Sequence, residues 1–201
     1  MPHLVDYYFT PVSPWTYLGH ARFAQLLRDT GSAVNVRPVD YGAIFPVSGG
    51  LPLPKRAPQR QAYRLVELER FRKALGLPLN LQPAHFPVSA DLASRLIIAV
   101  DQADGAWAAL DIAGRLGHAV WAEERNVADP ATLAAVVSEA GLPAERLAQA
   151  DAPEVAARFA ADTQAAIAAG VFGAPSYVID GEIFWGQDRL DFVERRLRAG
   201  T

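Results

Sequence analysis

Ser13 occupies the position in this chain that most favours chemistry. It lies in the stretch FTPVSPWTYL (residues 9–18), directly after the apolar run LVDYYF (4–9), so it stands where a strand turns into a helix. A hydroxyl at a helix N-terminus can donate a hydrogen bond to a bound anion, whose charge the helix dipole favours. Serine before proline is also a common helix start, in which the hydroxyl acts as the N-cap. The residues alone leave both roles open.

Other nucleophile and metal chemistries have weaker support. The chain has no cysteine, which excludes disulfides, thiolate metal sites and thiol redox chemistry by the protein itself. Its histidines (His3, His20, His85 and His118) are scattered, with no pair spaced to hold a metal ion, so we predict no metal site. A serine hydrolase is the weakest interpretation, because the chain lacks a G-x-S-x-G motif and a histidine and acid placed to serve Ser13.

A run of basic residues follows a segment rich in glycine and proline. This segment, DYGAIFPVSGGLPLPKRAPQ (40–59), predicts a long functional loop. Lys55 and Arg56 lie at its exit and could receive a carboxylate of a ligand. Arg60 and Arg64 continue the run on the next helix, and there we interpret them as a solvated face.

The first third of the chain must position Ser13. LVDYYF predicts a strand, residues 15–31 carry apolar side chains at helical spacing and stop at Gly31, and AVNVRPV (33–39) alternates like a second strand. A strand–helix–strand unit of this kind predicts two parallel strands.

Helical signals dominate residues 58–169, where apolar side chains recur every three or four positions. Asp129 followed by proline predicts one helix start, and Asp151 with Glu154 predicts a capping box ahead of another. Glu69 and Lys73 are spaced to pair on the outer face of the first helix. We therefore predict an all-helical insertion.

The C-terminal part returns to strands. SYVI (176–179) and EIFW (182–185) are separated by Asp180-Gly181, a pair that favours a type I′ turn, so we predict a β-hairpin. A last amphipathic helix follows, and Asp188 with Asp191 fits an N-cap pattern for it. This order of elements is typical of an α/β domain.

Two stretches together resemble a known family. GVFGAPSYVIDGEIFWGQDRL (170–190) resembles the region of thioredoxin-like proteins in which a cis-proline, here Pro175, opens the hairpin. YFTPVSPWTYL (8–18) resembles the active-site turn of the DsbA-like branch, with residues 13–16 at the positions of its Cys-x-x-Cys. With the helical insertion, these motifs resemble the 2-hydroxychromene-2-carboxylate isomerases and the related kappa-class glutathione transferases over nearly the whole chain.

The resemblance implies an α/β fold class: thioredoxin-like, of the DsbA/kappa type, with an inserted all-helical subdomain. The thioredoxin-like domain would comprise residues 1–45 and 170–201, and the insertion about 55–169, within a single chain unit.

The resemblance also implies glutathione as cofactor. Ser13 would host its thiolate, and the backbone of Ala174, beside Pro175, would pair with its cysteinyl part like an added strand. Asp188 would hold the γ-glutamyl amine, with Gln187 beside it, and the same carboxylate could still cap the last helix.

An aromatic substrate would lie beside the thiol. The aromatic residues that could line its slot are Trp15, Tyr17, Phe45 and Phe172, although aromatic residues near such turns are more often part of a core. Lys55 or Arg56 would stabilise negative charge on it. The chain departs from the isomerase pattern at Gly50, where the family usually has asparagine, and at Thr10 and Trp15, where it tends to have aspartate and tyrosine. These departures bear on the substrate more than on the cofactor.

The predicted function is therefore a glutathione-dependent cis–trans isomerase of an aromatic unsaturated keto acid. The implied reaction is of the type 2-hydroxychromene-2-carboxylate to trans-o-hydroxybenzylidenepyruvate, a step of aromatic catabolism, by reversible thiolate addition. A kappa-like glutathione transferase would use the same site but release the conjugate. An alternative of another class is a redox-inactive thioredoxin-fold binding or scaffold protein that holds peptides at the Pro175 edge.

Composition limits the partners. The chain has 201 residues, 51% of them hydrophobic, and a net charge of −3 without a long basic block, so we expect neither nucleic acid nor an anionic membrane surface as partner. No apolar run approaches the roughly 18 residues of a membrane-spanning helix. We expect a soluble cytoplasmic protein that binds small molecules, with a homodimer as the common default.

Overall fold

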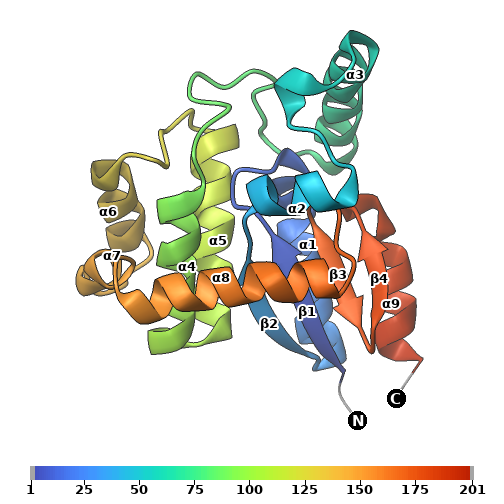
Figure 1. The fold of residues 1–201 in the computed structure, drawn as a ribbon. Helices are drawn as coiled ribbons and strands as arrows, with labels where there is room; N and C mark the ends of the chain where they lie inside the picture. Colours follow the sequence, from blue (N-terminus) through green and yellow to red (C-terminus); the bar gives the residue numbers. More distant parts are fainter. Residues whose placement is uncertain (1–2, 200–201) are drawn as a thin grey trace.

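The computed structural model describes residues 3–199, which contain a four-stranded mixed sheet in the order β2-β1-β3-β4 (Figure 1). The strands are β1 (Leu4–Phe9), β2 (Ala33–Pro38), β3 (Ser176–Ile179) and β4 (Glu182–Trp185). β1 runs parallel to β2, and β3 is antiparallel to both of its neighbours. The predicted parallel pair and the predicted hairpin are both confirmed.

The helix α1 (Pro14–Thr30) connects the two parallel strands. Its buried face carries Leu18, Phe23 and Leu27, and the helix ends at Gly31, whose φ of 63° is the left-handed conformation that glycine adopts freely. The strand–helix–strand unit places the N-terminus of α1, and with it Ser13, at the carboxyl end of β1.

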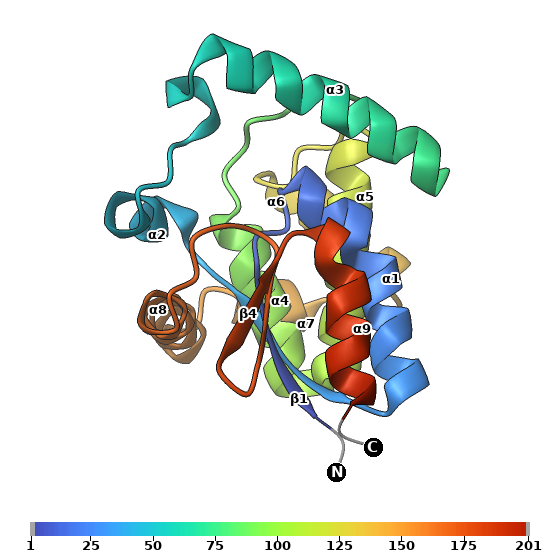
Figure 2. The ribbon, with the colours of Figure 1, turned by 90° about the vertical axis from the view of Figure 1, so that its right-hand side faces the viewer.

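Helices cover both faces of the sheet. Side chains alternate along β1, so Tyr7 points to one face and Tyr8 to the other. Tyr7 stacks on Tyr177 of β3, directly opposite in register, and belongs to the same apolar cluster as α1 and α9 (Leu190–Arg198). Tyr8 belongs to a second cluster with α8 (Pro153–Ala168). Figure 2 shows α1 and α9 on one side of the sheet and α8 on the other.

Residues 58–169 form helices and their connecting loops, without a strand, as predicted. Besides α8, the helices are α3 (Pro58–Leu75), α4 (Asp91–Asp104), α5 (Ala106–Trp121), α6 (Pro130–Glu139) and a short one that the sequence did not indicate, α7 (Glu145–Gln149). Trp121 and Leu96 are fully buried in the same apolar cluster as the central strands, so these helices share a core with the sheet. The division at residues 45, 55 and 170 stays a prediction about chain organisation.

The segment 40–59 is not the long loop that its glycines and prolines predicted. It contains α2 (Tyr41–Ser48) and a 3₁₀ helix, η1 (Leu53–Lys55). Asp40 caps α2 by accepting a hydrogen bond from the N–H of Gly42 at 2.7 Å, and Ile44 is fully buried. The cap and the apolar face stabilise a helix that composition alone argues against.

Of the two helix caps predicted within residues 58–169, one is formed and the other is not. Asp129 caps α6 as expected, accepting from the N–H of Ala131 at 3.1 Å. The predicted capping box before α8 is wrong, because the N-cap is Ala152 and has no side-chain cap hydrogen bond. Asp151 instead pairs with Arg95 at 2.7 Å. Proline at the first position of α8 supplies the backbone geometry of a helix start without a capping side chain.

The turn of the hairpin has the chemistry that its sequence indicates. Asp180 and Gly181 have φ angles of 50° and 82°, as a type I′ turn requires at both central positions. After β4, the 3₁₀ helix η2 (Gln187–Arg189) leads into α9, and neither helix has a side-chain cap hydrogen bond. The N-cap pattern of Asp188 and Asp191 is therefore not formed.

Within residues 3–199, no helix has both the length and the apolar character needed to cross a bilayer. The same part of the chain contains no group of three acidic or histidine side chains arranged to hold a metal ion.

Candidate active site

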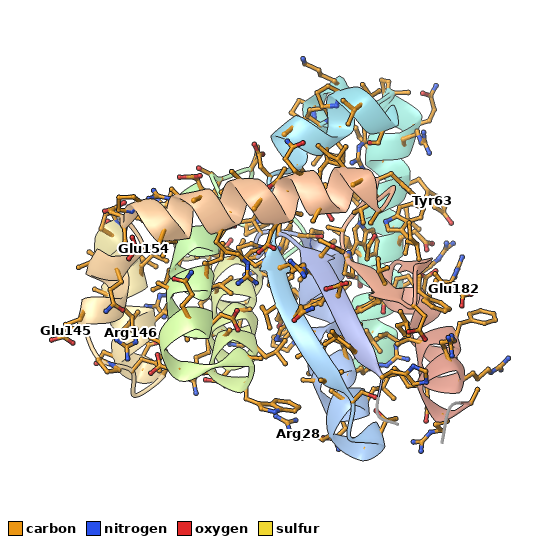
Figure 3. All side chains as sticks on the ribbon, turned by 60° about the horizontal axis from the view of Figure 1, so that its bottom comes forward. Arg28, Tyr63, Glu145, Arg146, Glu154 and Glu182 are labelled. Atoms are coloured by element: carbon orange, nitrogen blue, oxygen red, sulfur yellow. The ribbon has the colours of Figure 1, made fainter. Side chains whose placement is uncertain are left out.

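A cavity of about 970 Å³ lies where the turn after β1 meets α2, α3 and both ends of the C-terminal hairpin. In Figure 1, α2 and α3 lie above the end of the sheet at which α1 begins. Tyr63 of α3, a lining residue, and Arg146 of α7 lie on opposite sides of the molecule in Figure 3, so α7 is remote from this cavity.

Ser13 lies in the wall of the cavity and is 9% exposed. It is the N-cap of α1, and its Oγ accepts a hydrogen bond from the backbone N–H of Thr16 at 3.3 Å. The capping role is therefore confirmed, although 3.3 Å is long for an N–H···O bond. Because Oγ acts as the acceptor in this contact, the hydroxyl proton remains available to a second partner.

The backbone around Ser13 leaves one further donor. Its own N–H binds the carbonyl of Thr10 at 3.1 Å, and its carbonyl accepts the N–H of Tyr17 at 3.0 Å. Pro14 has no N–H, and the N–H of Trp15 has no acceptor among residues 3–199. The start of α1 thus presents a hydroxyl and an amide to the same end of the helix dipole.

The edge before β3 carries the cis peptide bond that the resemblance implied, between Ala174 and Pro175. Gly173 and Ala174 line the cavity. The carbonyl of Gly173 accepts hydrogen bonds from the hydroxyls of Tyr41, at 2.9 Å, and Ser176, at 2.8 Å. In the described part of the chain nothing hydrogen-bonds the backbone of Ala174, so its N–H and carbonyl are free for a ligand.

Gln187 contributes an unsatisfied amide. The residue is 1% exposed, lines the cavity, and both polar atoms of its side chain are buried without a hydrogen-bond partner among the described residues. A Cβ on Gly19 of α1 would lie 2.6 Å from the Cβ of Gln187, so the glycine permits this close packing. Asp188 also lines the cavity, and its half-exposed carboxylate pairs with Arg189 at 2.7 Å.

Three of the four aromatic side chains predicted for the substrate slot line the cavity, namely Trp15, Phe45 and Phe172. Trp15 packs edge-on against Phe71, with ring centroids 6.0 Å apart. Phe172 is 41% exposed and packs edge-on against Trp185 at 4.9 Å. Tyr17 is not a lining residue, because its hydroxyl is turned to the carbonyl of Pro78.

Only one of the two predicted cations lies at the cavity. Arg56 lines the cavity, and its Nε donates a hydrogen bond to the carbonyl of Leu51 at 2.8 Å. Lys55 is exposed and is not among the lining residues.

Sequence reasoning missed several lining residues, among them Arg64 and Trp185. Arg64 is 9% exposed, so the interpretation as a solvated face is wrong for it. A signal was present: Arg64 precedes the fully buried Leu68 by four residues and therefore lies on the same helix face. Trp185 ends β4 and covers Gly173, where a Cβ would lie 2.3 Å from the indole nitrogen. The glycine is the local sign of that contact.

The glycine at position 50 also has a structural reason. A Cβ there would lie 2.3 Å from the ring of Phe45, so the ring occupies the space that a side chain at this position would need. Phe45 and Gly50 both line the cavity, and this part of its wall is apolar instead of carrying an amide.

Comparison with known proteins gives a consistent result. Residues 4–198 match the DSBA-like thioredoxin domain family. The chain is 30% identical over 200 residues to the 2-hydroxychromene-2-carboxylate isomerase of Sphingobium xenophagum, covering 98% of this chain and 99% of that protein. It is 29% identical over 196 residues to the enzyme of the same name from Pseudomonas putida, covering 95% and 92%.

Solved structures agree. A 2-hydroxychromene-2-carboxylate isomerase superposes with a TM-score of 0.81 at 27% identity, covering 98% of this chain and 95% of that one. The cytosolic disulfide reductase DsbM from Pseudomonas aeruginosa superposes with a TM-score of 0.72 at 19% identity, covering 98% and 99%, which shows the shared DsbA-like thioredoxin fold. The chain therefore belongs to the DSBA-like thioredoxin family, and within it to the family of the 2-hydroxychromene-2-carboxylate isomerases.

Proposed function

We propose that this protein is a glutathione-dependent cis–trans isomerase of an aromatic unsaturated keto acid, of the type 2-hydroxychromene-2-carboxylate to trans-o-hydroxybenzylidenepyruvate. The observation that carries the proposal is that one cavity holds both Ser13, whose hydroxyl proton is free to donate, and Gln187, whose buried amide has no partner among the described residues. The names of the full-length relatives support an isomerase.

The lining residues fit glutathione. A γ-glutamyl tripeptide needs a donor for its sulfur, a free backbone edge for its cysteinyl unit and polar groups for its glutamyl end. The sulfur can accept a hydrogen bond from Ser13, and the cysteinyl unit can pair with the free backbone of Ala174. The glutamyl end can bind the unpaired amide of Gln187, and its amine can bind the carboxylate of Asp188. Because the chain has no cysteine, thiol chemistry in this cavity requires an external thiol.

Glutathione, when bound, supplies a thiolate, which can add reversibly to a conjugated C=C and so allow rotation about it. The protein's part is to favour the thiolate. The Ser13 hydroxyl and the Trp15 N–H can donate to the sulfur, and the N-terminus of α1 favours its negative charge. Each of these contacts lowers the pKa of a thiol.

The substrate requires a second electrostatic contribution. Negative charge develops on the keto oxygen of the substrate when its double bond is attacked, and a cation or donor near that oxygen lowers the barrier. Arg56 lines the cavity and is the candidate for this role. Trp15 and Phe172 provide aromatic surface for the ring of the substrate.

Thermal unfolding in the presence of glutathione tests the binding step. A ligand that binds only the native state stabilises it by about 2.7 kcal/mol at a hundredfold excess over its dissociation constant, so the unfolding midpoint rises with glutathione. The variant Gln187→Leu fills the same space without an amide and should lose most of this shift. If millimolar glutathione gives neither a shift nor heat in calorimetry, the proposal is wrong and the scaffold alternative gains support.

A further inference from the structure

Arg64 of α3 is a buried cation that has no counter-ion in the described part of the chain. It is 9% exposed, it forms no hydrogen bond or ion pair with any residue between 3 and 199, and one terminal nitrogen of its guanidinium is fully buried and unsatisfied. Arg37 provides a contrast, because it is also partly buried but pairs with Asp6 and Asp162.

Two aromatic rings hold the guanidinium in place. Its central carbon lies 5.2 Å from the ring centroid of Phe86 and 5.6 Å from that of Trp121, within the range of cation–π contacts. Burial, and then the neighbouring charge of Arg56, lower the pKa of Arg64 to about 10. The side chain is therefore still charged near neutral pH, and its orientation is fixed before a ligand arrives.

The other charges of the cavity do not neutralise it. Four arginines and two carboxylates are among the lining residues. Glu67 pairs with Arg70 and Asp188 with Arg189, so both carboxylates already have partners. A buried charge without a counter-ion is costly, and an anionic ligand would remove that cost.

The surroundings of Arg64 specify what kind of anion fits. Phe86, Phe71 and Trp15 line the same cavity and present aromatic surface. We propose that Arg64 binds the carboxylate of the aromatic keto acid and so determines the specificity of the enzyme for an acid over a neutral aromatic. This inference rests on the proposed function. Two arginines would then bind the substrate: Arg56 at the keto oxygen and Arg64 at the carboxylate.

Binding of trans-cinnamate, an aromatic unsaturated acid without a keto group, tests the inference in the absence of glutathione. Calorimetry should show that Arg64→Met lowers the affinity for cinnamate at least tenfold, whereas the neutral cinnamamide binds parent and variant equally. Lys73→Met is the matched control, because Lys73 lies on α3 but does not line the cavity, and its side chain is 73% exposed. It should bind cinnamate like the parent.

Stability separates a ligand role from a structural one. Replacing an unpaired buried charge with an apolar side chain is neutral or stabilising, so Arg64→Met should unfold at the same temperature as the parent or higher. A lower midpoint would indicate a structural role and count against the inference. Should that variant fold poorly, Arg64→Lys keeps the charge but loses the planar fork, and it should bind cinnamate more weakly than the parent.

A carboxylate of glutathione is the other possible source of the anion. If Arg64→Met loses affinity for glutathione but not for cinnamate, Arg64 belongs to the glutathione site and the inference is wrong. Unchanged cinnamate affinity in Arg64→Met also overturns it. The proposed function fails separately, when the parent binds cinnamate through Arg64 but does not isomerise the keto acid.

Discussion

The hydroxyl oxygen of Ser13 accepts the backbone N–H of Thr16 at 3.3 Å, so the side chain that caps α1 keeps its proton for another acceptor. Capping and thiolate binding are therefore compatible roles of one hydroxyl. Removing the hydroxyl should affect two different quantities. Loss of the cap lowers the stability of the fold, whereas loss of the donated hydrogen bond raises the pKa of the bound thiol.

Replacing Ser13 with alanine separates these losses. We expect Ser13→Ala to lower the free energy of unfolding by about 1 kcal/mol, the usual effect of losing an N-cap. The pKa of bound glutathione's thiol should rise, because a donor to the thiolate is gone. Thiolate absorbance against pH measures this pKa. If the thiol pKa in Ser13→Ala equals that in the parent, Ser13 acts only as a helix cap.

Thr16→Val is the matched control for that experiment. The Thr16 Oγ is buried and has no hydrogen-bond partner in the described part of the chain, while the backbone N–H that reaches Ser13 is retained. Removing an unsatisfied buried hydroxyl should stabilise the fold by about 1 kcal/mol, and the thiol pKa should stay as in the parent. A raised thiol pKa in this variant would show that the change at Ser13 is not specific.

Local patterns predicted the elements that surround Ser13 because their causes are local. Apolar alternation in residues 4–9, the helical spacing that ends at Gly31, and the positive φ angles of Asp180-Gly181 are each set by neighbouring residues. α2 was missed because its glycines and prolines were given more weight than its cap at Asp40.

The composition of the cavity could be predicted only in part, because its walls come from distant segments. The motifs at Ser13 and Ala174 indicated where two of these segments meet. The environment of Arg64 could not be read in the same way, since its contacts, Phe86 and Trp121, lie in other parts of the chain. The run of basic residues suggested a solvent-exposed face, but tertiary packing buries Arg64.

Position 50 provides a test of the packing around α2. Gly50→Asn should cost about 1–3 kcal/mol, because the new Cβ overlaps the ring of Phe45. Phe45→Ala removes that ring, so the double variant should be more stable than the sum of the two single effects predicts. Denaturant unfolding of all four proteins measures this coupling.

Gly49→Asn controls for the backbone. Gly49 has a φ of 76° and open space around its Cβ position, and asparagine tolerates this conformation better than most residues. We expect it to cost less than about 1 kcal/mol. If Gly50→Asn costs no more than Gly49→Asn, the contact with Phe45 does not explain the glycine.

Acid should destabilise the protein through His20. This side chain is buried between the hydroxyl of Tyr7 and the carbonyl of Leu110, and burial lowers its pKa from the usual 6.5. The unfolded state therefore binds a proton more readily than the native state, so stability is full above about pH 6.5 and falls as the pH drops below it. Denaturant unfolding at pH 7 and pH 5 measures the difference.

His20→Gln should lose less stability than the parent between these two pH values, because glutamine does not titrate. His85→Gln, at an exposed position, should behave like the parent. Equal losses in His20→Gln and the parent would mean that the acid sensitivity arises elsewhere in the chain.

The proposed mechanism requires an external thiol that acts catalytically in this cavity. Substrate absorbance and free thiol, followed together in one cuvette with 2-hydroxychromene-2-carboxylate, measure whether it does. We expect conversion to trans-o-hydroxybenzylidenepyruvate only when glutathione is present, with the concentration of free thiol unchanged at the end. Stoichiometric loss of thiol would identify a transferase instead, and undiminished turnover without glutathione would contradict the mechanism.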